Sequence, residues 1–191
     1  MKIYLIRHGQ TDWNVQGKIQ GSFESELNAA GVKQAEELGR QLLESGCKFA
    51  RIYSSRQKRA VMTAEILCEA VNASCIQVNG LEEMNLGKWE GHTWAEVKVK
   101  YPTEFTEWLA KRRYTKTPEG ESYQDVLDRV LPALQKIIGE NDEQDNFVVV
   151  THGAVIMSLQ CYLTNTPFDE MDKFKAKNTS ITVLDSEQLY N

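Results

Sequence analysis

The sequence predicts an α/β fold with three layers, in which helices cover both faces of a mostly parallel central sheet. Short apolar runs with strand character alternate with amphipathic helical stretches, which is the order typical of parallel strands. Two runs, residues 1–6 and 147–150, are almost entirely apolar, as expected for strands buried on both faces. With 191 residues, the chain suits a single domain over residues 1–191 with a sizeable core.

The first half of the chain contains three expected strands and two expected helices. The first strand starts at residue 2 and is followed by a polar loop to about Leu27. Asn28 is a suitable N-cap for a helix that ends at Gly46. A short strand at residues 52–53 leads into a second amphipathic helix, whose apolar stripe extends to residue 71. Residues 75–78 form the third strand.

The second half begins with a less regular segment, expected to form a helical, lid-like insertion over about residues 92–121. Two short helices are predicted in it, at residues 94–100 and 103–112, separated by Pro102. Ser122, with Asp125 three residues later, indicates the start of a long helix, in which Pro132 predicts a kink. A strand at residues 147–151, a helix at 154–163 and a last strand at 180–184 complete the fold.

Composition limits the classes of function. The formal net charge is −5, so the surface as a whole does not favour nucleic acid. The sequence shows no signal-peptide pattern before the first strand and no long apolar span, which predicts a cytoplasmic protein without a membrane partner. Four scattered cysteines without C-x-x-C spacing are expected to be reduced thiols and to form no zinc site. The oligomeric state is left open.

Two of the three histidines follow directly on apolar strands. Arg7, His8 and Gly9 come after the first strand, and His152 and Gly153 come after the strand at residues 147–151. In open α/β sheets, ligands bind beyond the carboxyl ends of the strands. If these two strands are neighbours in one parallel sheet, His8 and His152 face the same small volume.

Five stretches, in order, resemble the motifs of the histidine phosphatase superfamily, also called phosphoglycerate mutase-like. The resemblance covers nearly the whole chain and begins with an R-H-G-x-T-x-W-N opening. The later stretches include an S-S-x-x-x-R-A segment and an L-x-E-x-x-x-G-x-W-E-G segment. The matching positions are residues 7–14, 20–31, 54–60, 81–91, and 120–122 together with 150–153.

The resemblance implies a phosphohistidine mechanism. By position His8 is the nucleophile, and it needs an acceptor on its other ring nitrogen to fix the tautomer. Arg7 and Arg59 are the expected guanidinium clamps for phosphate oxygens. His152 is expected to donate an N–H to the phosphate in the transition state, and a protonated ring would help further. Because protein cations build the clamp, no metal or cofactor is expected.

The resemblance also assigns the proton transfer. Glu83 is the expected general acid for the leaving alcohol and the base for water. Its neighbour Glu82 should point the opposite way in an extended segment. Asn14, Gln20 and Gly21 are expected as secondary substrate contacts, through a side-chain amide and backbone N–H groups.

The expected activity is hydrolysis of a small phosphorylated metabolite, in the manner of small bacterial phosphatases such as α-ribazole phosphatase. Cofactor-dependent phosphoglycerate mutases, the alternative, carry E-R-H-Y where this chain has Glu83 followed by Met84. Arg112 and Arg113 leave mutase activity as an alternative, because mutases have paired arginines in a comparable insertion. A catalytically inactive member that binds a phosphorylated ligand is a third reading. The substrate itself remains open.

Overall fold

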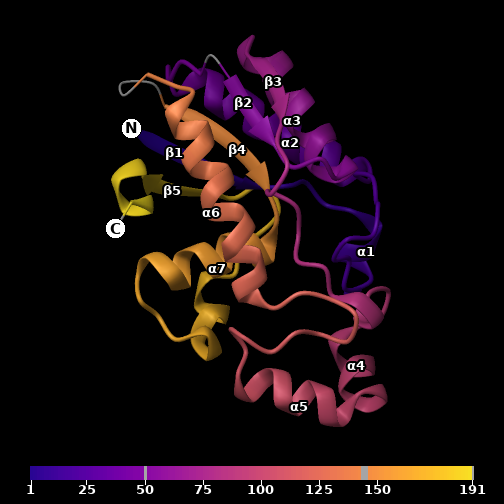
Figure 1. Ribbon diagram of the computed structural model, residues 1–191. Helices are drawn as coiled ribbons and strands as arrows, with labels where there is room; N and C mark the ends of the chain where they lie inside the picture. Colours follow the sequence, from indigo (N-terminus) through magenta and orange to yellow (C-terminus); the bar gives the residue numbers. More distant parts are fainter. Residues whose placement is uncertain (50, 143–145, 191) are drawn as a thin grey trace.

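A computed structural model describes residues 1–49, 51–142 and 146–190. In this part of the chain, one sheet has the strand order β3-β2-β4-β1-β5 (Figure 1). Its members are β1 (Lys2–Arg7), β2 (Arg51–Ser54), β3 (Ser74–Gln77), β4 (Phe147–Thr151) and β5 (Ile181–Asp185). Pairing is parallel except between β1 and β5. The predicted α/β fold with a mostly parallel sheet is therefore confirmed.

Helices pack on both faces of the sheet. One face is covered by α2 (Ala29–Glu44) and α3 (Lys58–Val71), and the other by α6 (Tyr123–Gly139) and α7 (Gly153–Leu163). Strand β4 contributes side chains to the hydrophobic clusters on both faces of the sheet, because side chains alternate along a strand. Phe147 and Val149 belong to the cluster with α6 and α7, whereas Val148 and Val150 belong to the cluster with α2 and α3.

Two helix starts form as their sequences predict. Asn28 caps α2 by accepting a hydrogen bond of 2.9 Å from the backbone N–H of Gly31. The helix ends at Glu44, and Gly46 follows with φ +71°, a conformation that favours glycine. Ser122 caps α6 in a capping box with Asp125. Such reciprocal bonds satisfy backbone groups that a helix end leaves free.

Several short elements were not expected from the sequence. The polar loop after β1 contains α1 (Asp12–Val15), capped by Thr11. Three 3₁₀ helices, η1 (Gly87–Trp89), η2 (Phe168–Phe174) and η3 (Ser186–Leu189), also lie within the described residues. Each is too short for a hydrophobic period to reveal it.

The segment expected as an insertion holds α4 (Trp94–Lys100) and α5 (Pro102–Ala110), which lie beyond the carboxyl edge of the sheet (Figure 1). Pro102 is the first residue of α5 rather than a spacer, since the first helical position needs no N–H donor. An aromatic cluster joins the segment to the rest of the core. Trp108 is buried against Trp89, at 5.4 Å between ring centroids, and against Tyr123, at 6.0 Å.

The expectation that all four cysteines are reduced was wrong for one pair. Cys68 in α3 and Cys75 in β3 form a disulfide, with their Cα atoms 6.1 Å apart. The reversal between them comes from Asn72, which adopts the left-handed conformation at the end of α3. This turn directs β3 back along the helix and brings the two thiols together. Cys47 and Cys161 are free.

The loop that follows β1 packs directly against the start of α2. A Cβ atom on Gly9 would lie 2.6 Å from the carbonyl oxygen of Gly31. A Cβ atom on Gly31 would collide with the carbonyl oxygen of Gln10. The backbone of Asn28 also donates to Gln10, at 3.0 Å. Glycine at both positions therefore permits the close approach that fixes the residues after His8.

We predict that Gly31→Ala destabilises the protein by about 1–3 kcal/mol, because backbone must move to admit the methyl group. Urea unfolding followed by circular dichroism measures the change. Gly139→Ala is the matched control. Gly139 is also helical, and a methyl group placed on it would have no neighbour within 4 Å, so alanine there should be neutral or stabilising. Equal free energies of unfolding for the two variants would contradict the close-approach argument.

Candidate active site

The two strand-end histidines meet at one edge of the sheet. β1 and β4 are parallel neighbours, with Arg7 opposite Thr151. This pairing brings the residues that follow the two strands, His8 and His152, to the same edge. The backbone N–H of His8 continues the ladder by donating to the carbonyl of Thr151, at 3.0 Å. The ring centroids of His8 and His152 are 5.2 Å apart, and both residues are buried.

His8 has a defined tautomer. Its Nδ1 lies 2.7 Å from the carbonyl oxygen of Gly9, which can only accept, so Nδ1 carries the proton and Nε2 keeps a lone pair. Burial lowers the pKa of His8 well below its ordinary value, and the charges of Arg59 and Arg7 lower it further. The imidazole is therefore neutral and has its free nitrogen available as a nucleophile.

His152 is also neutral, in contrast to the protonated ring considered from the sequence. Burial lowers the pKa of His152 well below its ordinary value, and Arg59 adds to the effect. Its Nε2 lies 2.7 Å from the hydroxyl oxygen of Ser55. If that hydroxyl donates, the ring proton is on Nδ1, which has no hydrogen-bond partner within the described residues. A neutral ring can still donate this N–H to a phosphate oxygen.

Both predicted arginines are anchored by backbone carbonyls. Arg7 donates from Nη1 to Ala176, at 2.7 Å. Arg59 donates to Gly21 and to Phe23, each at 2.8 Å. Burial lowers the pKa of both guanidinium groups, although each stays charged at neutral pH because arginine starts so high. The Nε atoms of both are buried and lack a partner within the described chain.

The neighbouring cations are placed differently. Arg56 is exposed, and Lys58 pairs with Glu26 at 3.3 Å on the surface. Arg112 and Arg113 do not line the cavity that holds His8. The guanidinium of Arg112 lies 4.8 Å from the ring centroid of Trp108, and that of Arg113 lies 5.3 Å from Phe168. These two side chains therefore pack on aromatic rings beside the site.

Glu83 lines the same cavity as His8, and Glu82 does not. Both carboxylate oxygens of Glu83 accept from the backbone N–H of Ala154, at 3.1 and 3.2 Å. Glu82 instead accepts from the backbone of Gly80, at 2.7 Å. The Glu83 backbone is held by Gln57, which accepts from its N–H, and by Arg129, which donates to its carbonyl. Its carboxylate thus lies at the start of α7, in the wall of the cavity that Arg7, His8 and Arg59 also line.

The predicted secondary contacts lie close by, partly in other roles than expected. The Gln20 side-chain oxygen accepts from the hydroxyls of Thr11, at 2.9 Å, and Ser25, at 2.6 Å. The Asn14 side-chain oxygen accepts from Asn178, at 3.1 Å. The carbonyl of Gly21 accepts from Arg59 and from Gln57. Gly21 therefore orients the arginine through its carbonyl, in addition to any contact its N–H makes.

One cavity of about 170 Å³ unites most of these residues. Of the predicted site residues, His152 alone is not part of its wall and adjoins it through His8. The remaining wall is apolar apart from two lysines and a phenol. The lining comprises Arg7, His8, Asn14, Lys18, Ile19, Gln20, Gly21, Arg59, Glu83, Leu86, Trp94, Tyr123, Gly153, Ala154, Met157, Lys175 and Ala176.

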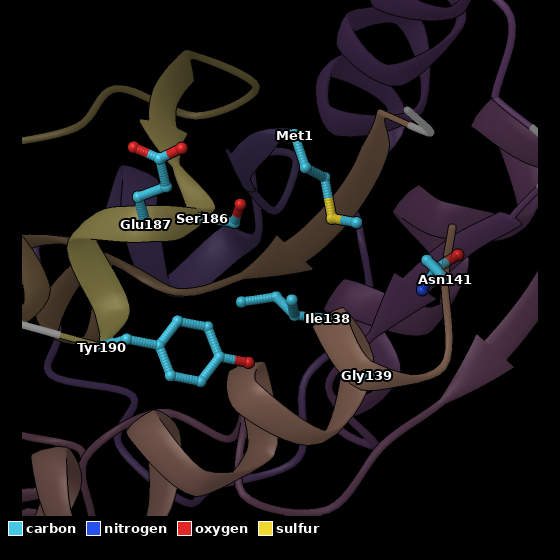
Figure 2. Close-up of a pocket in the computed structure, with 7 residues that line it drawn as sticks. All are labelled: Met1, Ile138, Gly139, Asn141, Ser186, Glu187 and Tyr190. Carbon is cyan, nitrogen blue, oxygen red and sulfur yellow. The ribbon is translucent and has the colours of Figure 1, made fainter. Parts of the chain in front are cut away.

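A larger cavity, of about 490 Å³, lies at the opposite end of the sheet, before β1 begins. Figure 2 shows its wall, in which Met1 and the end of α6 face Ser186 and Tyr190 of the C-terminal segment. Among the described residues, its wall contains no histidine, arginine or lysine. The residue types in the two walls therefore favour the smaller cavity as the candidate active site.

Four residues that support the site were not singled out as functional from the sequence. Ser55 contacts His152, and Gln57 connects Gly21 to the backbone of Glu83. Arg129 bonds the carbonyls of residues 80, 82 and 83. Asn178 donates to the carbonyl of His8, at 2.9 Å. Ser55 and Gln57 lie inside a recognised motif, but Arg129 and Asn178 have no local signal.

The chain shares this arrangement with proteins of known class. It is 31% identical to phosphoserine phosphatase 1 of Hydrogenobacter thermophilus, over 100% of this chain and 89% of that protein. It is 35% identical to 6-phosphofructo-2-kinase/fructose-2,6-bisphosphatase 3 of Rattus norvegicus, over 91% of this chain. That alignment spans only 29% of the rat protein, so only one part of it corresponds to this fold.

A solved structure has a similar fold over nearly the whole chain. The structure of a putative α-ribazole-5'-P phosphatase from Escherichia coli superimposes with a TM-score of 0.82 at 26% identity, covering 96% of this chain and 89% of that one. The sequence profile of the histidine phosphatase superfamily (branch 1) matches residues 3–189. The chain therefore belongs to the histidine phosphatase superfamily, branch 1.

Proposed function

We propose that this protein is a phosphomonoester hydrolase that acts on a small phosphorylated metabolite through a phosphohistidine at His8. The observation that carries the proposal is the set of donors around a neutral imidazole. Nε of Arg7, Nε of Arg59 and Nδ1 of His152 are buried without partners within the described residues. Three such donors around a nucleophilic nitrogen suit the oxygens of a phosphoryl group.

In the proposed first step, the Nε2 lone pair of His8 attacks phosphorus and the bond to the ester oxygen breaks. Glu83, protonated, gives its proton to the leaving oxygen. In the second step Glu83 takes a proton from water, the water oxygen attacks phosphorus, and the P–N bond breaks to release phosphate and neutral His8. The arginines and His152 stabilise the added charge on the phosphoryl oxygens in both steps.

The size of the cavity supports a small substrate. At about 170 Å³ it is below the ~300–1,000 Å³ usual for pockets that enclose drug-sized ligands. The relatives named above act on phosphoserine, on fructose bisphosphate or, putatively, on α-ribazole phosphate. All are phosphate monoesters of metabolites. We further propose that residues 92–121 act as a lid, since Trp94 at the start of α4 lines the cavity.

Phosphoglycerate mutase activity is the alternative. A mutase must hold a second acidic group and keep water from the phosphoenzyme. The paired arginines that would serve it, Arg112 and Arg113, pack on aromatic rings outside the cavity wall. This placement leaves the cavity without the enclosed arginine clamp that would keep water away, which favours hydrolysis. An inactive binding protein is less favoured, because His8, Glu83, Arg7 and Arg59 all line one cavity.

The activity is tested with a panel of phosphate esters and a mutase assay. We expect phosphate release from at least one small ester. With 3-phosphoglycerate and catalytic 2,3-bisphosphoglycerate, we expect phosphate to form faster than 2-phosphoglycerate. Isomer formation that far outpaces phosphate release would favour the mutase. No release from any ester, including p-nitrophenyl phosphate, would favour the inactive binding protein.

We predict that a phosphoryl label forms at His8 during turnover. The label should be acid-labile and base-stable, and His8→Ala should abolish it. Because the pKa of His8 is lowered, the ring stays neutral as the pH falls through 6.5, so the rate of labelling should not drop there. Rapid quench with a ³²P-labelled ester measures both effects. A label that survives His8→Ala would move the nucleophile elsewhere.

We predict that Glu83→Gln slows alkyl esters more than aryl esters. A phenolate leaves without help, whereas an alkoxide needs the proton, so the alkyl ester should lose about 10²–10⁴-fold and the aryl ester much less. Values of kcat/KM for a glycerol phosphate and for p-nitrophenyl phosphate give the comparison. Glu82→Gln is the matched control and should change both little. Equal losses on the two esters would remove Glu83 from the acid role.

A further inference from the structure

We infer that Lys18 and Lys175 form a second anion site at the catalytic cavity and select phosphate esters that carry a carboxylate. This inference rests on the proposed function and deepens it by naming a substrate class. Both lysines belong to the wall of the 170 Å³ cavity that also contains His8, Arg59 and Glu83. They come from separate parts of the chain, one after α1 and the other directly after η2.

Lys175 is fixed relative to the phosphate clamp. Its neighbour Ala176 accepts the 2.7 Å hydrogen bond from Nη1 of Arg7. Ala176 is buried and also lines the cavity. The guanidinium that would bind phosphate therefore holds the backbone from which the lysine extends. This connection fixes the backbone of Lys175 beside Arg7, while the Lys175 side chain itself remains exposed.

Lys18 is fixed from the other wall. Its backbone N–H donates to the carbonyl of Trp13, at 2.9 Å, and it forms an isolated β-bridge with Thr93. Its Nζ lies 5.7 Å from the centroid of the Trp13 ring, at the outer range of a cation–π contact. Three residues further along the chain, the carbonyl of Gly21 accepts the hydrogen bond that orients Arg59. Lys18 is thus tied both to the second clamp and to the start of α4.

Neither lysine has a carboxylate partner within residues 1–49, 51–142 and 146–190. Other surface lysines there do, as shown by Lys173 with Glu170, at 2.8 Å, and Lys88 with Glu119, at 2.7 Å. Two uncompensated positive charges at one small cavity, beside two buried arginines, create a local positive potential on a protein of net charge −5. Such a potential favours a ligand that carries negative charge beyond its phosphate.

The other residues in the wall of the cavity limit the class of substrate further. Glu83 is the only carboxylate among the lining residues, and its oxygens accept from the backbone of Ala154. Much of the remaining wall is apolar, with Ile19, Leu86, Trp94 and Met157. These four side chains offer little to an ammonium group or to the several hydroxyls of a sugar. A compact phosphorylated hydroxy acid fits these features best.

Three esters of nearly equal size separate the contributions. 3-Phosphoglycerate carries a carboxylate, glycerol 3-phosphate has a hydroxymethyl group in its place, and phosphoserine keeps the carboxylate but has an ammonium group in place of the hydroxyl. We expect kcat/KM to be highest for 3-phosphoglycerate, by about tenfold over glycerol 3-phosphate, the factor that one charge-assisted hydrogen bond supplies. The preference should shrink as salt is added, because the lysines are solvent-accessible.

Substitution of the lysines tests the assignment. Lys18→Met and Lys175→Met should each lower the ratio of kcat/KM values for 3-phosphoglycerate over glycerol 3-phosphate several-fold, mainly through KM. The matching arginine variants should keep the ratio. Lys173→Met is the control, since Lys173 is two residues from Lys175, is ion-paired and does not line the cavity. Binding of the same esters to His8→Ala, measured by calorimetry, gives the ratio without turnover.

The outcomes separate this inference from the proposed function. Hydrolysis with no preference for the carboxylate, or with a preference that both Met variants retain, overturns the lysine site and leaves the hydrolase intact. An equal loss in Lys173→Met would show a general surface-charge effect and would also overturn it. Absence of turnover overturns the hydrolase alone if calorimetry still shows a lysine-dependent preference for the carboxylate.

Discussion

Parallel pairing of β1 with β4 is the constraint on which the site depends. The register places Arg7 opposite Thr151, so the next residue on each strand is a histidine at the same edge. A shift of one residue would reverse which face every side chain of a strand occupies. Ile3 and Leu5 would then leave one core and Ile6 the other. The apolar pattern that builds the two cores therefore also sets the distance between the rings of His8 and His152.

The site combines buried cations with neutral histidines. Arg59 is fully buried, and its charge is met mainly by backbone carbonyls, from Gly21 and Phe23. Carbonyl dipoles stabilise a guanidinium without neutralising it. Burial lowers the pKa values of the two nearby imidazoles, and the remaining positive potential lowers them further, so both rings stay unprotonated. In the proposed mechanism this arrangement serves two purposes, because the arginines that attract the phosphate also help to preserve the lone pair that attacks it.

Sequence reasoning predicted the parts of this design that have a local signature. Strand ends, the Asn28 and Ser122 caps and the positions of His8, Arg59 and Glu83 follow from short-range patterns. The choice of Glu83 over Glu82 depended on a motif spacing, and the two carboxylates do point to different partners. The disulfide and the neutral state of His152 were not predicted. The first needs the turn at Asn72, and the second needs the burial that only the assembled fold supplies.

The residues that support the site from a distance could not be predicted from local sequence patterns. Arg129 lies on α6, among ordinary polar positions of an amphipathic helix, yet it holds the segment that carries Glu83 through three carbonyls and the carboxylate of Glu121. Its partners are 46 to 49 residues away in the sequence for the carbonyl bonds. No period or spacing within the helix distinguishes it from a solvated arginine.

The bonds from Arg7 to Ala176 and from Asn178 to His8 span 169 and 170 residues. The loop that follows β1 is therefore completed by residues that are synthesised much later than the loop itself. A polypeptide still on the ribosome could form β1 and cover it with α2, but Arg7 would lack its anchor until Ala176 left the exit tunnel. If this loop binds phosphate as proposed, it becomes competent to do so only after these anchoring residues have been translated.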